Sequence, residues 1–583
     1  MILIMDNLKY SDILNRNHEL GTKIKTDKYY ITILSNITLN TLKELLEYPL
    51  RNVNINAEVK IGNYNNIVQD SKKHSKSDAV IIFWELSNIL DGFQYKVELL
   101  DDQEFESIFK QIQSEIDLAL QFLCDTPLLL FNRFSSLHFN SFDDENSAFR
   151  RLVMKLNQYL ESKKKKNLLI VDIERIISNI STVKSIDLRF FYSAKMLYTI
   201  EFFKEYVKNI IPYIFSVNGQ SKKALILDCD NTLWKGIIGE DGYDGIEMSQ
   251  ETKDGSIFYD VQSNVLNLIK KGVIIGLCSK NNLQDVNQVI KSHPDMQLRD
   301  NHIAIKRINW DNKVSNLLEI SKDLDIDTSK MVYIDDSSFE VNLIKNKLPK
   351  VLALQVPKKL YKYPKFIKDI NRYFFNLSKT SEDEKRVIMY KEQEHRNILK
   401  SQFDNIDDFL ISLKMKMTVC RNNKSVIPRL SQLTQKTNQF NLTSKRYTEA
   451  DINSFLEDKS SDIFCFSVED KFGESGITGL SIILNSKSNS VNVDTLLMSC
   501  RIIGRNLEYA FMDFIINEMK NRKVKTIFSQ FIATKKNRQV EVFFENCFFK
   551  CIKSESDGLI KNYILDIDNY KPKNLKYIEV VDG

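Results

Sequence analysis

The sequence lacks the features that mark zinc-binding, secreted or membrane proteins. Its eight cysteines are scattered, and no two of them form the CxxC pair typical of zinc and redox sites. No apolar run approaches the roughly 20 residues of a membrane helix. The N-terminal run MILIM is too short for the core of a signal peptide. Free cysteines without an export signal predict a cytoplasmic protein that has no membrane segment.

An excess of charge of either sign is also missing. The chain has 82 lysines and arginines against 77 acidic residues, which gives a net charge of +5. This balance gives no reason to expect a nucleic acid as a partner. At 583 residues the chain is too long for one hydrophobic core, so several domains are expected.

The order of strand-like and helix-like runs divides the chain into three blocks. In the first two, short apolar runs alternate with helical patterns, which predicts parallel sheets covered on both faces. These runs lie at 29–35, 78–84, 127–131 and 167–173, and then at 223–228, 273–279, 302–308 and 331–336. In the third block several strands precede a helix, which is typical of an α+β domain. The predicted fold class is therefore α/β and multidomain, with boundaries at 1–215, 218–360, 361–404 for a helical linker, and 405–575.

Two aspartates follow the first apolar run of the second block. In LILDCDNTLWKGIIGEDGYDG, Asp228 and Asp230 are separated by one residue, so strand alternation places both side chains on one side. Ligand sites of open parallel sheets lie at these carboxyl ends of strands. Two carboxylates there can bind Mg²⁺, and one can attack phosphorus while the other moves a proton.

Polar residues follow the other strands of this block in a defined order. Ser279 ends the second strand, Lys313 begins a helix after the third, and Asp335-Asp336 end the fourth. This order of DxD, Ser, Lys and DD resembles the haloacid dehalogenase (HAD) superfamily of phosphotransferases. The resemblance implies that Asp228 is the nucleophile and Asp230 the general acid/base. It further implies that the phosphate contacts are Thr232, Ser279, Lys280, Asn281 and Lys313, and that the metal site is formed by Asp228, the main chain of Asp230, Asp335 and Asp336.

The intervals between these motifs are short. Fifty residues lie between Asp228 and Ser279, and 33 lie between Ser279 and Lys313. A glycine-rich flap, helices and strands occupy both intervals, which leaves no room for a large cap domain. We therefore expect an open site that accepts a bulky or protein-borne substrate, or one that another domain covers.

Longer motifs resemble one subfamily more closely. DNTLWKGIIGEDG, CSKNN, INWDNKVSNL and IDDSSFEVNLI are similar to the FkbH-like family, HAD subfamily IIIC, as are 432–452, 470–479, 496–508 and 533–549. The resemblance covers about residues 25–575. It implies an enzyme of polyketide-type pathways that takes the glyceryl group of 1,3-bisphosphoglycerate with loss of phosphate. The group would pass through a cysteine thioester to the phosphopantetheine of an acyl carrier protein, with Mg²⁺ as the cofactor.

Acyl transfer of this kind needs a thiol, and three cysteines are candidates. Cys500 follows a strand and begins CRIIGR, where we expect a helix whose backbone amides lower the thiol pKa with help from nearby arginines. Cys278 precedes Ser279 and would lie beside the phosphate. Cys229 lies between the two aspartates, but strand alternation turns it into the core. Free buried cysteines are also common in cores, so a structural role stays open.

The outer blocks resemble two further domain families. RIIGRN is similar to the pyrophosphate loop of the GNAT acetyltransferases, which implies that Arg501, Gly504 and Arg505 bind coenzyme A or the arm of a carrier protein, with Asn438 and Asn441 lining the channel. The first block resembles an SGNH-hydrolase-like domain with Ser35 at the nucleophile position. Asp187 is followed by no histidine at the expected place, so a scaffold or carrier-docking role is expected there.

The sequence leaves three functions for the whole chain. The first is the carrier-loading acyltransferase. The second is an Mg²⁺-dependent phosphatase of a bulky or carrier-bound substrate, with the third domain as a lid. The third, a non-enzymatic assembly subunit, is disfavoured because every residue expected of the HAD site is present.

Overall fold

The computed structural model describes most of the chain. The described residues are 5, 8–89, 92–137, 147–165, 167–377, 392, 396, 399–400, 402–403, 405–486, 489–534, 536–555 and 558–583. They divide into two compact units, Met1–Ser221 and Lys222–Gly583. Much of the predicted linker 361–404, including 378–391, lies outside the described residues, and so do Met1 to Ile4 of the apolar N-terminal run.

The first unit contains a five-stranded parallel sheet of order β2-β1-β3-β4-β5. Its strands are β1 (Lys28–Ser35), β2 (Asn56–Ile61), β3 (Ala79–Phe83), β4 (Leu128–Asn132) and β5 (Leu168–Val171). Every residue of β3 and β4 is buried, as expected for strands that helices cover on both faces.

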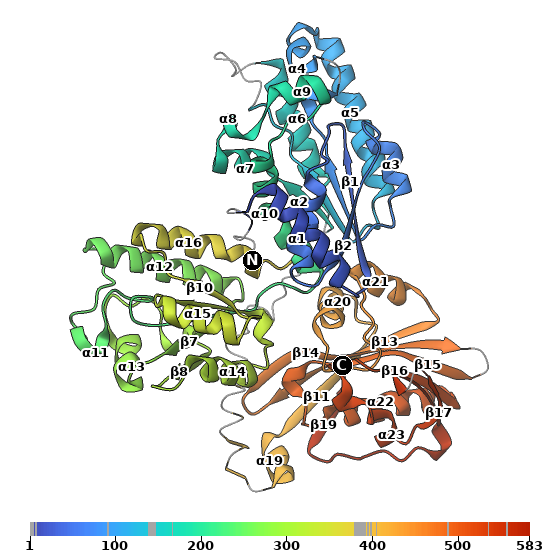
Figure 1. Cartoon of the computed structure of the whole chain (residues 1–583). Coiled ribbons are helices and arrows are strands. Elements are labelled where there is room, and N and C mark those ends of the chain that lie inside the picture. Colours follow the sequence, from blue (N-terminus) through green and yellow to red (C-terminus); the bar gives the residue numbers. More distant parts are fainter. Residues whose placement is uncertain are drawn as a thin grey trace. The chain divides into compact units, whose positions relative to one another are not determined.

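The helices of this unit form two groups, which Figure 1 shows in blue and blue-green. One group contains α1 (Tyr10–Lys23), α2 (Leu42–Arg51), α7 (Ile173–Ile180) and α10 (Ile200–Val217); the other contains α3 (Ile67–Lys73), α5 (Asp102–Phe122) and α6 (Ala148–Ser162). Short helices complete the unit: α4 (Phe93–Lys96), α8 (Thr182–Ser185) and α9 (Leu188–Ala194). Helix α10 extends to Val217, two residues beyond the predicted boundary at 215.

The second unit begins with another parallel sheet, of order β10-β9-β6-β7-β8. Its strands are β6 (Ala224–Leu227), β7 (Ile274–Ser279), β8 (Ile305–Ile308), β9 (Met331–Asp335) and β10 (Leu352–Gln355). The helices are α11 (Ile238–Asp241), α12 (Lys253–Lys270), α13 (Leu283–Ser292), α14 (Lys313–Asp323), α15 (Ser338–Lys347) and α16 (Tyr363–Ile370). Helices α12 and α16 contact each other, and so do α14 and α15 (Figure 1).

The chain reverses its direction of strand addition at β6. The connection from β6 leads outward to β7 and β8, whereas β9 and β10 lie on the other side of β6. Loops that leave neighbouring strands in opposite directions open a crevice at the carboxyl ends, which is where ligands of such sheets bind. The residues after β6 and β9 border this crevice.

The third sheet is mixed, with nine strands among the described residues in the order β17-β18-β16-β15-β14-β13-β11-β19 and with β12 paired to β15. Its strands are β11 (Met415–Arg421), β12 (Phe440–Asn441), β13 (Ser461–Asp470), β14 (Gly473–Ser486), β15 (Ser490–Met498), β16 (Thr526–Ile532), β17 (Lys550–Glu555), β18 (Ile560–Asp566) and β19 (Ile578–Asp582). The helices are α19 (Ile406–Leu413), α20 (Ile427–Lys436), α21 (Glu449–Glu457), α22 (Leu507–Asn521) and α23 (Phe543–Asn546).

Helices cover both faces of the third sheet. Figure 1 shows α20 and α21 on one face and α22 on the other, and each side has its own apolar cluster. Two parallel-sheet parts followed by a mixed sheet with helices confirm the predicted α/β multidomain class. Among the described residues, none of the helices has the length and apolar character needed to cross a bilayer.

A short segment fills a gap inside the third sheet. The parallel strands β15 and β16 pair only from Ser490/Thr526 to Val493/Ser529. Beyond that point β12 pairs antiparallel with β15, and the carbonyl of Leu442 accepts a hydrogen bond from the amide of Ile532 in β16. Leu442 is fully buried. The segment is therefore a fixed strand of the sheet.

The fully buried Asn537 side chain ties this segment to β16, so its removal should loosen both. Its amide donates to the carbonyls of Asn441 and Ile532, at 2.9 Å each. Because Asn537→Ala leaves two buried carbonyls without this donor, we expect local stability to fall by about 2–3 kcal/mol. Hydrogen exchange of peptides spanning 437–443 and 526–532 should accelerate. The matched control Asn517→Ala, on the exposed side of α22, should change nothing there; equal exchange in both variants would contradict this role.

Candidate functional site

Four neighbouring segments bring the sequence-predicted polar residues together. Asp228 directly follows β6, Ser279 ends β7 and Asp335 ends β9. Strands β7 and β9 flank β6, so these three side chains belong to adjacent strand ends. Lys313 is the first residue of α14, which follows β8. The sheet thus collects residues that lie up to 107 positions apart.

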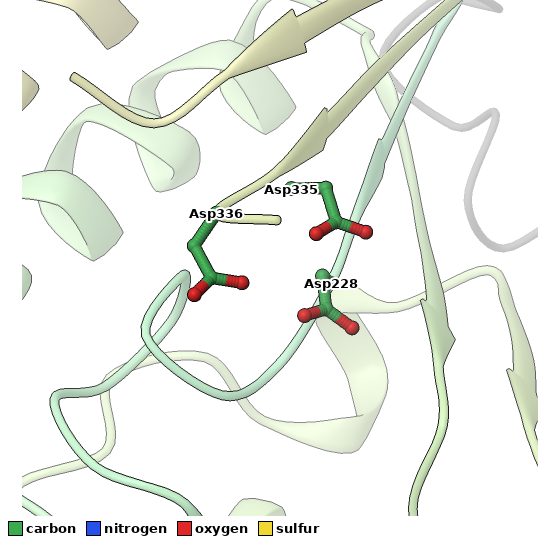
Figure 2. Close-up of side chains that lie close together, drawn as sticks. All are labelled: Asp228, Asp335 and Asp336. Carbon is green, nitrogen blue, oxygen red and sulfur yellow. The ribbon is translucent and has the colours of Figure 1, made fainter. Parts of the chain in front are cut away.

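Three carboxylates share one small space at this edge. One oxygen from each of Asp228, Asp335 and Asp336 lies within 4.8 Å of the other two. Figure 2 shows their carboxylates turned toward a common space between the ends of β6 and β9. Asp335 is fully buried and Asp228 is 6% exposed. So much negative charge in a poorly hydrated place requires a cation.

The Lys313 ammonium supplies one positive charge. Its Nζ lies 2.9 Å from Asp228 Oδ1 and 2.7 Å from Asp335 Oδ2, and its side chain is 5% exposed. Burial, reinforced by the Asp335 carboxylate, raises the pKa of Asp228, although Lys313 opposes that rise. Burial would lower the pKa of Lys313, but the two carboxylates outweigh it and raise that pKa. The lysine therefore stays charged, and with all three carboxylates ionised two negative charges of the cluster remain uncompensated.

The donor set fits a hard divalent cation. Mg²⁺ binds through one or two carboxylates and keeps several water or phosphate ligands. Asp228, Asp335 and Asp336 supply carboxylate oxygens only, and Ser337 N fixes Asp335 by donating to its Oδ1 at 2.8 Å. Tyr333 donates a hydrogen bond to the other oxygen of Asp335. The residues present are thus suited to Mg²⁺.

Asp230 is held apart from this cluster by three hydrogen bonds. Its Oδ1 accepts from the indole of Trp234 at 2.9 Å and from the amide of Ile238 at 3.1 Å. Its Oδ2 accepts from the side-chain amide of Asn281 at 2.8 Å. These donors fix the carboxylate in one orientation. The prediction that Asp230 contacts the metal through its main chain is compatible with this arrangement.

Only some of the predicted phosphate contacts lie beside the three carboxylates. Ser279 is buried and its hydroxyl hydrogen-bonds Asp228, while Asn281 Nδ2 lies 3.3 Å from Ser279 Oγ. Lys280 points elsewhere and forms an ion pair with Glu340 at 2.7 Å. Thr232 is fully buried, and its carbonyl accepts from Tyr363 at 3.1 Å. Ser279, Asn281 and Lys313 thus border the carboxylates, whereas Lys280 reaches the rim.

The flap after β6 is small. It contains the four-residue helix α11 and two isolated bridges, Asp230 with Trp234 and Lys235 with Glu247. Gly236 has φ of 101°, and a Cβ there would lie 2.7 Å from Asp241 Oδ2, so glycine is required at this turn. From 230 to 278 the chain forms this flap, α12 and most of β7, and from 280 to 312 it forms α13 and β8. Neither interval contains a cap domain.

Neither Cys278 nor Cys500 is a thiol with a lowered pKa. Cys278 is fully buried in the apolar cluster beneath β7, on the opposite side of the strand from Ser279, and burial raises its pKa to about 12. Cys500 begins a three-residue 3₁₀ helix, and the α-helix α22 starts only at Leu507. The predicted lowering of the Cys500 pKa is wrong: burial, together with the Asp325 carboxylate, raises it to about 12.

Cys500 contacts the second sheet, whereas Cys229 is enclosed in the core. Asp325 lies in the turn before β9, at the end of that strand opposite to Asp335, so the contact of Cys500 is at the amino-terminal edge of the second sheet. Cys229 is fully buried, as predicted for a residue that alternation turns inward, and burial raises its pKa. Activation of any of the three as a nucleophile requires a change in its surroundings.

The residues predicted to bind a carrier arm are engaged within the third domain. Asn441 is fully buried in β12 and its Oδ1 accepts from Ser444 N at 2.9 Å, so it does not line an open channel as predicted. Asn438 accepts a hydrogen bond from Arg446. Arg505, 5% exposed, forms an ion pair with Asp470 at 3.2 Å.

Two residues of the predicted pyrophosphate loop, Gly504 and Arg501, are less enclosed than Arg505. Gly504 has φ of 81° and open space where a Cβ would be. Arg501 is partly exposed, and its Nε lies 3.4 Å from Ser499 Oγ. Asn506, with φ of 60°, is the residue that precedes α22 and donates to Tyr577 at 2.7 Å. Gly504 has the left-handed backbone of a turn, and the second arginine, Arg505, points into the protein.

The serine predicted at the nucleophile position of the first unit is buried. Ser35 ends β1, is 4% exposed and accepts a hydrogen bond from Ile37 N at 3.0 Å. Asp187 forms an exposed ion pair with Arg189 at 2.6 Å. The scaffold or docking role expected for this unit stays a prediction.

Sequence reasoning missed residues that orient the aspartates. Tyr333 lies two positions before Asp335 on the same strand face, and Trp234 lies one helical turn after Asp230. Both spacings are visible in MVYIDD and DCDNTLW. Glu340, which holds Lys280, has no comparable signal because 60 residues separate the pair.

Comparison with solved structures finds a similar fold. The crystal structure of the N-terminal part of the protein BF1531 from Bacteroides fragilis, containing a phosphatase domain complexed with Mg, covers 64% of this chain and 99% of its own, with 22% identity and a TM-score of 0.56. The ribosomal-protein-S18-alanine N-acetyltransferase from Escherichia coli covers 27% of this chain and 97% of its own, with 14% identity and a TM-score of 0.21. Neither the protein-family models nor the curated proteins contain a match. The first likeness shows that this chain shares the fold of the phosphatase-containing protein.

A carboxylate of the cluster should control metal affinity. Asp335→Asn removes one charge that Mg²⁺ would contact, so we expect the affinity to fall by about tenfold or more. Calorimetric titration of the full chain with Mg²⁺ measures this. Asp244→Asn, an exposed flap residue, is the matched control and should bind as the native chain does. Native affinity in Asp335→Asn, with an unchanged circular dichroism spectrum, would refute the assignment.

Proposed function

We propose that this chain is an Mg²⁺-dependent enzyme that loads the glyceryl group of 1,3-bisphosphoglycerate onto the phosphopantetheine thiol of an acyl carrier protein. The observation that carries the proposal is the cluster of Asp228, Asp335 and Asp336 around Lys313, beside Ser279. This arrangement suits a dianionic phosphoryl group bound next to a metal ion. The donor and the acceptor rest on the resemblance in the sequence motifs.

The reaction breaks the bond between the acyl carbon and the bridging oxygen. A thiolate attacks the carbonyl carbon of the acyl phosphate, a thioester forms, and phosphate leaves with the bridging oxygen and its electron pair. In a cysteine-mediated route the carrier thiol then attacks this thioester and the protein thiolate leaves. Bound Mg²⁺ would neutralise charge that develops on the departing phosphate.

The residues of the site have separate tasks in this scheme. The Lys313 ammonium and the Ser279 hydroxyl hold phosphoryl oxygens, while Asp335 and Asp336 hold the metal. Asp230 can give a proton to the departing phosphate or take one from the attacking group, because its three donors fix it in place. The absence of a cap between 230 and 312 leaves space for a carrier-borne thiol.

The phosphatase alternative is favoured by a different observation. Cys278 is buried, Cys500 is partly exposed, and the pKa of each thiol is raised, so neither is an activated thiol in this state. Asp228 would then attack phosphorus, the bond between phosphorus and the bridging oxygen would break, and water would hydrolyse the aspartyl phosphate. The two functions therefore cleave opposite bonds of the same bridging oxygen.

Incorporation of ¹⁸O from water into phosphate shows which bond breaks. The chain is incubated with 1,3-bisphosphoglycerate, Mg²⁺ and a holo-carrier protein in water enriched in ¹⁸O. Loading predicts phosphate without ¹⁸O and a glyceryl-carrier product in the intact mass. Attack on phosphorus would put one ¹⁸O into the phosphate, and phosphate so labelled, without a carrier adduct, would refute loading. A reaction without the protein corrects for spontaneous hydrolysis.

Variants then assign the residues of the transfer. Asp228→Asn should reduce phosphate release by about 10³-fold or more under either function, because it removes a carboxylate that contacts Lys313 and the metal. Cys500→Ala and Cys278→Ala separate the routes. Loss of a protein-bound glyceryl adduct with retained phosphate release marks the acceptor cysteine; carrier loading that survives in both variants and in their double variant indicates direct attack by the carrier thiol. Native phosphate release in Asp228→Asn would contradict the site itself.

A further inference from the structure

Four large apolar side chains stand exposed on the loops that carry the candidate site. Ile237 on the flap after β6 is 38% exposed, and Leu283 at the start of α13, after β7, is 48% exposed. Trp310, after β8, is 70% exposed, and Phe339 at the start of α15, after β9, is 69% exposed. Each follows a different strand of the second sheet. We call these four residues the apolar collar.

Hydrogen bonds connect the collar to the site. The Trp310 indole donates to Asn282 Oδ1 at 3.2 Å, and the neighbouring Asn281 donates to Asp230. The amide of Ile238, next to Ile237, also donates to Asp230. The collar is therefore fixed around the acid/base carboxylate by the same contacts that orient it.

An ion pair joins two further loops of the collar, those after β7 and β9. Lys280, two residues after β7, forms an ion pair with Glu340, which is next to Phe339. Leu283 is three residues from Lys280. Side-chain contacts thus link the loops after β6, β7, β8 and β9 beside the strand ends that carry the candidate site.

This exposure is unusual for its position. Single exposed apolar residues are common on protein surfaces, but neighbouring ones beside a polar site indicate a bound partner. A three-carbon acyl phosphate is small and polar, and the buried charged cluster suffices to hold it. The collar suits a longer, partly apolar group that stands above the phosphoryl site.

The residues predicted to line a channel for that group in the third domain do not form one. The gap between β15 and β16 is closed by β12, and Asn441 and Arg505 make internal contacts. A pantetheine arm combines a dimethyl group and methylene groups with two amides and ends in a thiol. An arm above the collar would bring this thiol toward a carbonyl group whose phosphate lies at Lys313.

We propose that the apolar collar of Ile237, Leu283, Trp310 and Phe339 binds the pantetheine arm of the acyl acceptor. This rests on the proposed loading function and names the surface that recognises its acceptor. The dimethyl group and the methylene chain pack on Trp310 and Phe339, which removes their exposed ring faces from water. Asn282 holds the indole of Trp310 in the orientation that receives the arm.

A binding experiment tests the collar without any turnover. Trp84 and Trp234 are 5% and 0% exposed, so acrylamide quenching of the tryptophan emission reports on Trp310. Millimolar pantetheine should reduce the quenching constant about twofold, whereas cysteamine, which has the thiol without the arm, should not. Phe339→Ala should abolish this protection. Leu318→Ala on α14, with the same 48% exposure as Leu283, should retain it. Unprotected Trp310 in the native chain would overturn the proposal.

A kinetic experiment tests the collar in the reaction. With pantetheine as the acceptor, Trp310→Ala should raise the KM for pantetheine about tenfold and raise the KM for 1,3-bisphosphoglycerate less. Trp310→Phe should restore most of the affinity. An equal rise of both KM values, or none, would overturn the proposal. If the native chain transfers no acyl group, the loading function fails, and the quenching experiment still decides whether the collar binds the arm.

Discussion

The ion pairs of Lys313 with Asp228 and Asp335 are the interaction on which the candidate site depends. Three carboxylates within 4.8 Å repel each other, and the burial of two of them would favour neutral carboxyl groups. One buried ammonium at 2.7–2.9 Å from two of these carboxylates makes their ionised forms tolerable. It does not balance all the charge, and the remainder is what attracts a divalent cation. A divalent cation would therefore complete a cluster that the protein alone leaves negative.

The parallel sheet explains why this cluster could be predicted from the sequence. In a parallel sheet all strands end at the same edge, so residues that follow β6, β7 and β9 meet regardless of the length of chain between them. The apolar runs that form these strands are short, buried and easily recognised. The proximity of Asp228, Ser279, Lys313 and Asp335 follows from that topology. Strands β2 and β10 were missed because each lies at an edge of its sheet, where burial is incomplete.

The predictions that failed concern residues whose state is set by distant partners. The pKa of Cys500 depends on burial and on Asp325, a residue 175 positions earlier, and nothing in CRIIGR indicates either. Asn441 belongs to a polar-looking segment, TQKTNQFN, but the separation of β15 from β16 draws that segment into the sheet. The polar composition predicted a solvated channel there. Where β15 and β16 separate, however, their backbone N–H and C=O groups need hydrogen-bond partners, and this segment supplies them.

The closed gap in the third sheet and the open site in the second together bear on the source of the attacking thiol. An acyl phosphate is hydrolysed readily when water reaches it, so an enzyme that transfers its acyl group must place a thiol at the carbonyl carbon before water arrives. The thiols of Cys229 and Cys278 are buried beneath the carboxylates with raised pKa values, and Cys500 contacts the opposite edge of the sheet. A thiol that comes with the acceptor, guided by apolar side chains around the opening, meets this requirement without a cap domain. The same collar would exclude water from the site while the arm is bound, which is the task that a cap performs in a closed site.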